Sequence, residues 1–225
     1  MFTVMNDTIT AIATPPGEGG LSIIRISGED ALRIAMILFH PAKSNSDLTP
    51  QKVVFGEIRD PETNQCRDEV LLTFFKAPKS YTAEDVIEIS AHGGTLITKK
   101  ILALVLAQGA RLAEPGEFTR RAFTNGRLDL TQAEAVADVI ESASDKALNS
   151  AMAQLKGGLS SRLSALHETL LNAQSQLEAS IDFSEDGLTF QSRSDTQKQI
   201  QQVESELKEL VDSFRHGKIV REGMQ

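Results

Sequence analysis

Three features that would place a chain outside the cytoplasm are missing from this sequence. There is a single cysteine, Cys66, so no internal disulfide can form, which fits a reducing compartment. No run approaches the roughly 20 apolar residues that a membrane-spanning helix needs. Residues 1–10 carry neither a basic segment nor a long apolar core, so they do not resemble a signal peptide. We therefore expect a cytoplasmic protein with no membrane partner.

Proline is also missing from the second half of the chain. All 7 prolines lie at or before Pro115, and proline is the residue that helix interiors tolerate least. Upstream, short apolar runs alternate with turns, whereas the downstream sequence has helical spacing. We therefore expect a change of architecture at residues 114–134, a segment that also holds Arg120, Arg121 and Arg127. We interpret this segment as both a hinge and a working surface.

Positive charge is in deficit over the chain as a whole. The formal net charge is −8, and hydrophobic residues make up 40% of the 225 residues. This composition is typical of a globular chain with one or two domains. A strongly acidic chain is a poor general binder of polyanions. Any contact with nucleic acid should therefore use a local basic patch or be supplied by a partner.

The first half contains alternating strand and helix signals. Ser27 and Asp30 resemble a capping box, so a helix should begin near Glu29. A second helix follows residue 94 and should end at Gly109. Closely spaced strands argue against a purely parallel sheet, so we predict an α+β domain with a mixed sheet. The predicted strands are residues 8–14, 21–26, 53–58, 70–75, 86–90 and 111–113.

The second half is predicted to be all helical. Thr131 and Glu134 form a capping-box pattern, and Ser144 can cap the helix that follows. Apolar residues then recur over residues 148–181 at close to the period of a straight helix. Gly157 and its neighbouring glycine are the weak point, where the helix could either break or pack closely against another helix.

A last helix is predicted near the C-terminal end. Residues 183–190 form an acidic connector, and apolar residues from Ile200 to Phe214 then recur at helical spacing until Gly217, which should end the helix. Two long amphipathic helices need a surface against which to bury their apolar sides. We therefore expect a helical bundle, of which this chain need not supply every helix.

Two segments that could carry chemistry have simpler explanations. Residues 15–20, PPGEGG, lack the G-x-x-x-x-G-K-[ST] order of a phosphate loop, and that order occurs nowhere in the chain. We predict a tight turn there and no nucleotide hydrolysis by these residues. Four scattered histidines and one cysteine do not suggest a metal site. His92, beside two glycines, is explained more simply by a local hydrogen bond than by contact with a ligand.

Arg25 and Glu88 stand within otherwise apolar predicted strands. They could form a cross-strand ion pair, or both could be exposed. Alternatively, both could line a pocket, because a carboxylate accepts two parallel N–H donors from a heterocycle and a guanidinium binds a carboxylate. Two interpretations are also open for Arg120, Arg121 and Arg127. They could be a solvated helix end and loop, or they could contact an anion.

Three ordered motifs resemble one protein family. They are ATPPGEGGLSIIRISG at residues 13–28, SYTAEDVIEISAHGG at 80–94 and PGEFTRRAFTNGRLDLTQAEAVADVI at 115–140. In this order and spacing they resemble the N-terminal half of the MnmE family, also called TrmE, the tRNA-modification GTPases of bacteria and organelles. The likeness covers essentially the whole chain and is weakest at 41–67 and beyond residue 187.

The resemblance implies a fold and a cofactor. Residues 1–118 would form a domain similar to the folate-binding domain of aminomethyltransferases, which also makes the homodimer. Residues 119–225 would begin a helical domain and end at the start of an inserted GTPase domain. By motif position, Arg25, Glu88 and Arg127 would contact 5-formyltetrahydrofolate or another one-carbon tetrahydrofolate, with no catalytic residue in this chain. GTP, magnesium and potassium would bind only through the GTPase domain.

The resemblance also implies a function for the intact protein. It would act with the flavoprotein MnmG on the wobble uridine of certain tRNAs, adding a carboxymethylaminomethyl or aminomethyl group. GTP hydrolysis would drive a conformational change. A free-standing folate-dependent aminomethyl transferase is an alternative, but it needs a catalytic acid or base. A non-enzymatic helical scaffold is another, but it does not explain Arg25 or the glycine-rich strand ends.

Overall fold

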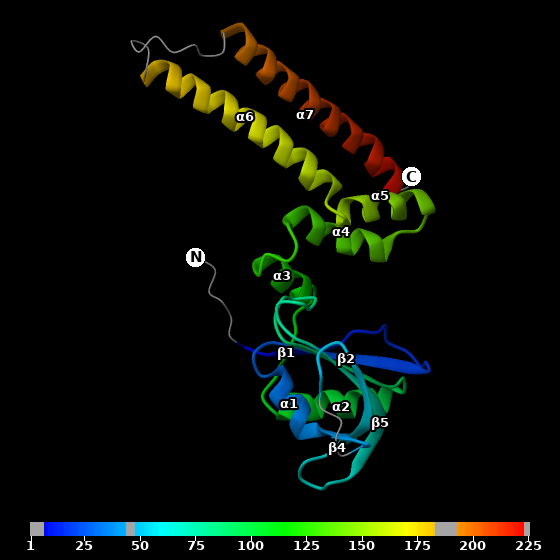
Figure 1. The fold of residues 1–225 in the computed structure, drawn as a ribbon. Coiled ribbons are helices and arrows are strands. Elements are labelled where there is room, and N and C mark those ends of the chain that lie inside the picture. The colour runs from blue at the N-terminus through cyan, green and yellow to red at the C-terminus, as the bar shows by residue number, and fades with distance from the viewer. Residues whose placement is uncertain (1–6, 44–47, 183–192, 223–225) are drawn as a thin grey trace. The chain divides into compact units, whose positions relative to one another are not determined.

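The computed structural model describes residues 7–43, 48–182 and 193–222. Contacts divide the chain into two compact units, Met1–Leu128 and Asp129–Gln225 (Figure 1). The first unit holds a seven-stranded mixed sheet with helices, and the second is helical. This architecture confirms the predicted fold class. The division lies later than the boundary after residue 118 that the sequence suggested, because an ion pair between Glu117 and Arg111 joins helix α3, Glu117–Thr124, to strand β7.

The sheet is antiparallel except at one edge. Its strand order is β3-β4-β5-β6-β2-β1-β7, and only the pairing of β1 with β7 is parallel. A mixed sheet of this kind is what the sequence predicted. The strands are β1 Ile9–Ile12, β2 Leu21–Ser27, β3 Phe39–Pro41, β4 Val53–Arg59, β5 Cys66–Phe75, β6 Val86–His92 and β7 Arg111–Leu112.

One face of the sheet forms the hydrophobic core with helices α1, Ala31–Leu38, and α2, Thr95–Ala107. Ile24 and Ile26 of β2 are fully buried in this core. Because successive side chains of a strand point to opposite faces, Arg25 lies on the face away from the core. Glu88 of β6 occupies the same face, directly opposite Arg25. The alternation thus places both candidate site residues on one open surface.

The start of α1 differs from the prediction. The capping box expected at Ser27 and Asp30 is wrong: Asp30 is the N-cap residue, but its side chain makes no capping hydrogen bond. The hydroxyl of Ser27 lies 2.6 Å from that of Thr82 and donates to Glu84 at 2.7 Å instead. Ser27 ends a buried strand, so its hydroxyl is used in a tertiary contact rather than in the next helix.

The end of α2 agrees with the prediction. The helix ends at Ala107, and Gly109 adopts a φ of 102°. That conformation lies in the left-handed region, which glycine adopts more readily than other residues.

The second unit begins with a different cap from the one predicted. Asp129 is the N-cap of α4, Leu130–Glu141, and forms a capping box with Gln132. The prediction of Thr131 and Glu134 as the box is therefore wrong. Ser144 caps α5, Asp145–Leu155, as predicted, by accepting from the backbone of Ala147 at 3.2 Å.

The long apolar repeat of the second half is broken into two helices. Gly157 has a φ of 85° and separates α5 from α6, Gly158–Asp182, so of the two alternatives the break is observed. Helix α7 runs over Arg193–Glu222. The expected stop at Gly217 is therefore wrong, because an interior glycine costs a helix only about 1 kcal/mol. The predicted connector at 183–190 lies outside the described residues.

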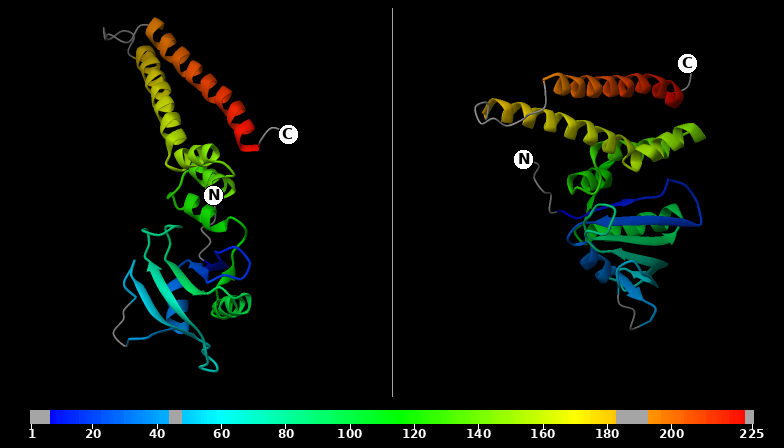
Figure 2. Two further views of the ribbon diagram at one scale, coloured as in Figure 1. Left: turned by 90° about the vertical axis from the view of Figure 1, so that its right-hand side faces the viewer. Right: turned by 45° about the horizontal axis from the view of Figure 1, so that its top comes forward.

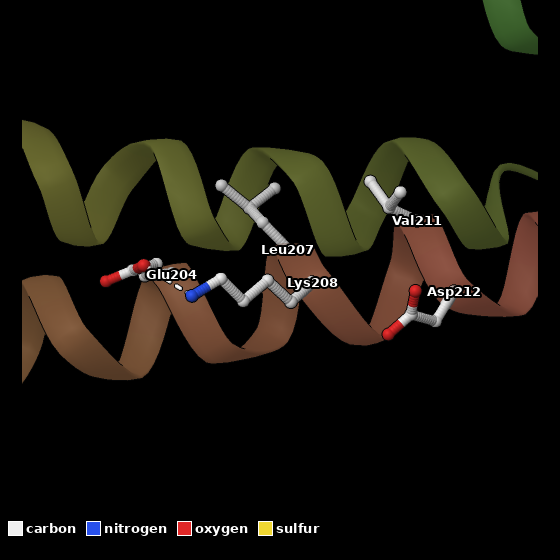
Figure 3. Close-up of a pocket in the computed structure, with 5 residues that line it drawn as sticks. All are labelled: Glu204, Leu207, Lys208, Val211 and Asp212. Atoms are coloured by element: carbon white, nitrogen blue, oxygen red, sulfur yellow. Dashed lines mark hydrogen bonds and ion pairs between the residues drawn. The ribbon is translucent and has the colours of Figure 1, made fainter.

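Helices α6 and α7 contact each other as an antiparallel pair (Figure 2). A shallow hollow of about 240 Å³ lies along α7, where Lys208 pairs with Glu204 at 2.6 Å (Figure 3). Both helices retain exposed apolar side chains, including Leu163, Leu170, Leu177, Ile200, Leu207 and Val211. No helix among the described residues is long and apolar enough to cross a membrane.

Candidate functional site

Arg25 and Glu88 form a cross-strand ion pair on the open face of the sheet. Nε and Nη2 of Arg25 both donate to Oε1 of Glu88, at 2.9 and 2.7 Å. The two side chains are 25% and 23% exposed. Among the described residues, no hydrogen bond involves Oε2 of Glu88. The pair is therefore accessible to solvent and retains an acceptor oxygen for a further partner.

Tyr81 brings the third candidate residue to this pair. It lies in the segment between β5 and β6, and its ring centroid is 5.3 Å from Cζ of Arg25 and 5.1 Å from Cζ of Arg127. Guanidinium groups are attracted to the electron-rich face of an aromatic ring at such distances. Arg25 and Arg127, which come from separate segments, thus lie against a single aromatic side chain, and Glu88 joins them through its ion pair with Arg25.

Two aromatic residues of this cluster were not among the residues singled out from the sequence. Phe118, on α3, Glu117–Thr124, has its ring centroid 5.6 Å from Cζ of Arg25. Tyr81 and Phe118 both stand within the motifs that carry the family resemblance. Their position in those motifs was the available signal, whereas nothing in the local residue pattern indicates that they meet Arg25.

Helix α3 is fixed to the sheet by the buried carboxylate of Glu117. Arg111 of β7 donates to both of its oxygens, at 2.7 and 3.0 Å, and Arg121 donates at 3.2 Å. The side chain is only 1% exposed. The hydrogen bonds from Arg111 lower the pKa of Glu117 to about 2, so the carboxylate stays charged despite its burial.

The three arginines within residues 114–134 occupy different environments. Arg121 is 8% exposed and donates to the backbone oxygen and to Oδ1 of Asp7, at 2.8 and 2.6 Å, and to Glu84 at 3.2 Å. It therefore fits neither interpretation offered from the sequence, since it is a buried part of the fold. Arg120 is 55% exposed and pairs with Glu114 at 3.0 Å. Of the three arginines, only Arg127 joins the cluster around Tyr81.

The glycine-rich strand end has a structural explanation. Nδ1 of His92 lies 2.6 Å from Oδ1 of Asp68, and this hydrogen bond raises the pKa of His92. The local hydrogen bond expected for His92 is thus present. A Cβ atom on Gly93 would lie 2.3 Å from the backbone oxygen of Gly19, so only glycine fits there. The tight turn expected at residues 15–20 is instead part of a longer loop, because β1 ends at Ile12 and β2 begins only at Leu21. The backbone N of Gly19 donates to the backbone O of Gly93 at 3.2 Å, which joins this loop to the end of β6.

Two protein-family models match consecutive parts of the chain. The model described as "GTP-binding protein TrmE N-terminus" matches residues 8–127. The model described as "MnmE helical domain" matches residues 130–225. The two matches meet where the structure divides into its two units.

Curated relatives agree with these family models. Proteins named tRNA modification GTPase MnmE are 46% identical over 220 residues in Syntrophus aciditrophicus, 47% over 222 residues in Levilactobacillus brevis and 45% over 220 residues in Geobacter metallireducens. The alignments cover 97–98% of this chain and 47–48% of each relative. The chain therefore spans about half the length of the curated relatives it matches.

Proposed function

This chain belongs to the MnmE (TrmE) family of tRNA-modification GTPases, and from that premise we propose that it binds a one-carbon tetrahydrofolate such as 5-formyltetrahydrofolate. The observation that carries the proposal is the contact of Arg25 and Arg127 with the ring of Tyr81, together with the ion pair that joins Glu88 to Arg25. A single ligand that contacts all three charged residues would explain why they come together from separate segments.

The chemistry of the cluster suits the two polar ends of a reduced folate. A pterin edge presents parallel N–H donors, which a carboxylate can accept in pairs. Glu88 has this capacity, because Oε2 makes no hydrogen bond among the described residues and Oε1 is bound only by Arg25. We assign Arg25 and Arg127 to carbonyl or carboxylate groups of the ligand, which a guanidinium binds strongly.

Binding of 5-formyltetrahydrofolate to the 225-residue chain, followed by calorimetry, tests the proposal. Glu88→Gln keeps the size of the side chain and removes its charge. A charge-assisted hydrogen bond contributes roughly 1.5–3 kcal/mol, so affinity should fall by about one to two orders of magnitude. Glu69→Gln, at an exposed carboxylate of β5, is the matched control and should bind like the parent chain.

One outcome would remove this site from consideration. If Glu88→Gln and Arg25→Ala both fold and bind 5-formyltetrahydrofolate as the parent does, the ligand lies elsewhere. Glu84 and His92 would then be the next residues to substitute.

For the intact protein we propose the function implied by the family. It would act in the cytoplasm with the flavoprotein MnmG, adding a carboxymethylaminomethyl or aminomethyl group to the wobble uridine of certain tRNAs. The part described here would supply the one-carbon donor and form the homodimer, while GTP hydrolysis would drive conformational change. Glu88→Gln in the full-length protein should lower the modified fraction of wobble uridine, measured by mass spectrometry of digested tRNA.

A further inference from the structure

Tyr81 is the one tyrosine of this chain, which has no tryptophan. Its side chain makes contacts at both ends. The ring lies against the guanidinium groups of Arg25 and Arg127, and the hydroxyl lies 2.8 Å from Oγ1 of Thr119. Arg25 stands on β2, Thr119 on α3 and Arg127 in the turn after α3. One aromatic side chain therefore joins the sheet to the helix and to the turn that follows it.

The position of Arg127 depends on this ring more than that of Arg25 does. Arg25 is also held by two hydrogen bonds to Glu88. The side chain of Arg127 is exposed, and within the described ranges its guanidinium makes no hydrogen bond or ion pair. A long charged side chain without such contacts samples many rotamers, so the contact with Tyr81 is what restricts Arg127 to the neighbourhood of Arg25.

We propose that Tyr81 is a positioning residue of the folate site, holding Arg25 and Arg127 so that both guanidinium groups face the same ligand. The inference rests on the proposed folate binding. Two like charges on one ring repel each other, and an anionic or carbonyl-bearing ligand that contacts both guanidinium groups relieves that repulsion. The ring has few rotatable bonds, so it keeps the two cations in place at little entropic cost.

Substitutions at Tyr81 separate the ring from the hydroxyl. Tyr81→Leu removes both ring contacts and should weaken binding of 5-formyltetrahydrofolate about tenfold. Tyr81→Phe keeps the ring and loses only the contact with Thr119, so it should bind within about twofold of the parent. Equal losses in the two variants, or no loss in Tyr81→Leu, would overturn the proposal. Thermal unfolding of each variant checks that it folds.

A double-mutant cycle with Arg127→Ala tests whether Tyr81 acts through that arginine. If it does, Tyr81→Leu should weaken binding only about threefold in the Arg127→Ala background, because Arg25 is then the one arginine that the ring still positions. A residue that merely stabilises the fold, or that contacts the ligand by itself, would cost the same factor in both backgrounds. The same tenfold loss in the Arg127→Ala background would therefore contradict a positioning role.

The single tyrosine also allows a test without ligand. A chain labelled with 13C in its tyrosine ring gives one set of ring signals in NMR, which belong to Tyr81 without further assignment. Arg25→Ala and Arg127→Ala should each shift these signals, because each removes a cation from the ring. Arg33→Ala, on the exposed side of α1, is the matched control and should leave them in place. Tyr81 ring signals whose chemical shifts do not change in Arg127→Ala would overturn the inference.

These experiments distinguish failure of the inference from failure of the proposed function. A parent chain that does not bind 5-formyltetrahydrofolate contradicts the proposed function and also the positioning role of Tyr81, which depends on it. A chain that binds the folate and loses affinity on Glu88→Gln, but not on Tyr81→Leu, keeps the folate site and overturns the role of Tyr81 alone.

Discussion

Neighbouring arginines in this chain differ in role because they differ in burial. Arg121 is enclosed by Asp7 and by Glu117, whereas Arg120, the preceding residue, stands in solvent. A surface ion pair such as that of Arg120 contributes little to stability. Removing one partner of a buried pair is costly, because the charge left behind stays buried without a partner. We therefore expect a substitution of Arg121 to lower the free energy of unfolding much more than the same substitution of Arg120.

The buried carboxylate of Glu117 should make stability depend on acid pH. Its pKa in the folded chain is about 2, mainly because Arg111 donates hydrogen bonds to it, against an ordinary value of 4.5. A lowered pKa means that the unfolded chain takes up the proton first. The stabilisation is therefore complete above about pH 4.5 and is lost as the pH falls towards 2. Arg111 also lowers the pKa of Asp7, which adds in the same direction.

Urea unfolding of the parent chain and of Glu117→Gln across this range measures the effect. Lowering the pKa of Glu117 from 4.5 to about 2 corresponds to about 3 kcal/mol of stabilisation. The parent should lose up to that much of its free energy of unfolding on acidification, and Glu117→Gln should show a flatter pH profile. Glu114→Gln, at an exposed carboxylate, should keep the profile of the parent. Parallel profiles for the parent and Glu117→Gln would mean that another group controls the acid response.

At the scale of elements, helix starts depend on which side chain reaches the free backbone N–H groups. Oδ1 of Asp129 accepts from the backbone N of Gln132 at 2.9 Å, and Oε1 of Gln132 accepts from the backbone N of Asp129 at 3.0 Å. Thr131 and Glu134 have the sequence pattern of a capping box, but the cap is already formed by Asp129, and the hydroxyl of Thr131 donates to Oδ1 of Asp129 at 2.8 Å.

The two alternative caps of α4 give different results on substitution. Asp129→Ala removes the observed cap and should lower the free energy of unfolding by about 1 kcal/mol. Glu134→Ala, at an exposed position of the same helix, should change it by less than about 0.5 kcal/mol. Chemical denaturation of the two variants beside the parent measures both values. A larger loss for Glu134→Ala would favour the cap that the sequence suggested.

At the scale of the whole molecule, we expect the chain to form a dimer without any nucleotide. The proposal follows from the resemblance described above, which implies that residues 1–118 would make a homodimer. A two-fold interface is the commonest arrangement of soluble homo-oligomers. Sedimentation velocity of the 225-residue chain at tens of micromolar should give the mass of two chains. A strict monomer at that concentration would count against it, and a dimer that forms only on adding GTP would as well.

The sequence by itself determined the features that depend on neighbouring residues. Short apolar and β-branched runs predicted every strand of the sheet except β3, and the absence of proline after Pro115 predicted the helical half. Gly109 and Ser144 were placed correctly at a helix end and a helix start. These signals arise from backbone and side-chain preferences within about one helical turn or a few strand residues. The same local information misplaced the caps of α1 and α4. At α1, the hydroxyl of Ser27 bonds the distant Glu84, and at α4 the earlier residue Asp129 forms the cap.

Only the tertiary structure decided which of these residues meet. Arg25 and Glu88 are 63 residues apart, and the pairing register of β2 with β6 alone sets them opposite each other. Arg121 and Asp7 are 114 residues apart, yet their contact removes Arg121 from the surface. The meeting of Arg127 with Tyr81 likewise depends on where α3 docks. Contacts of this range follow from strand order and packing, which local periodicity does not encode.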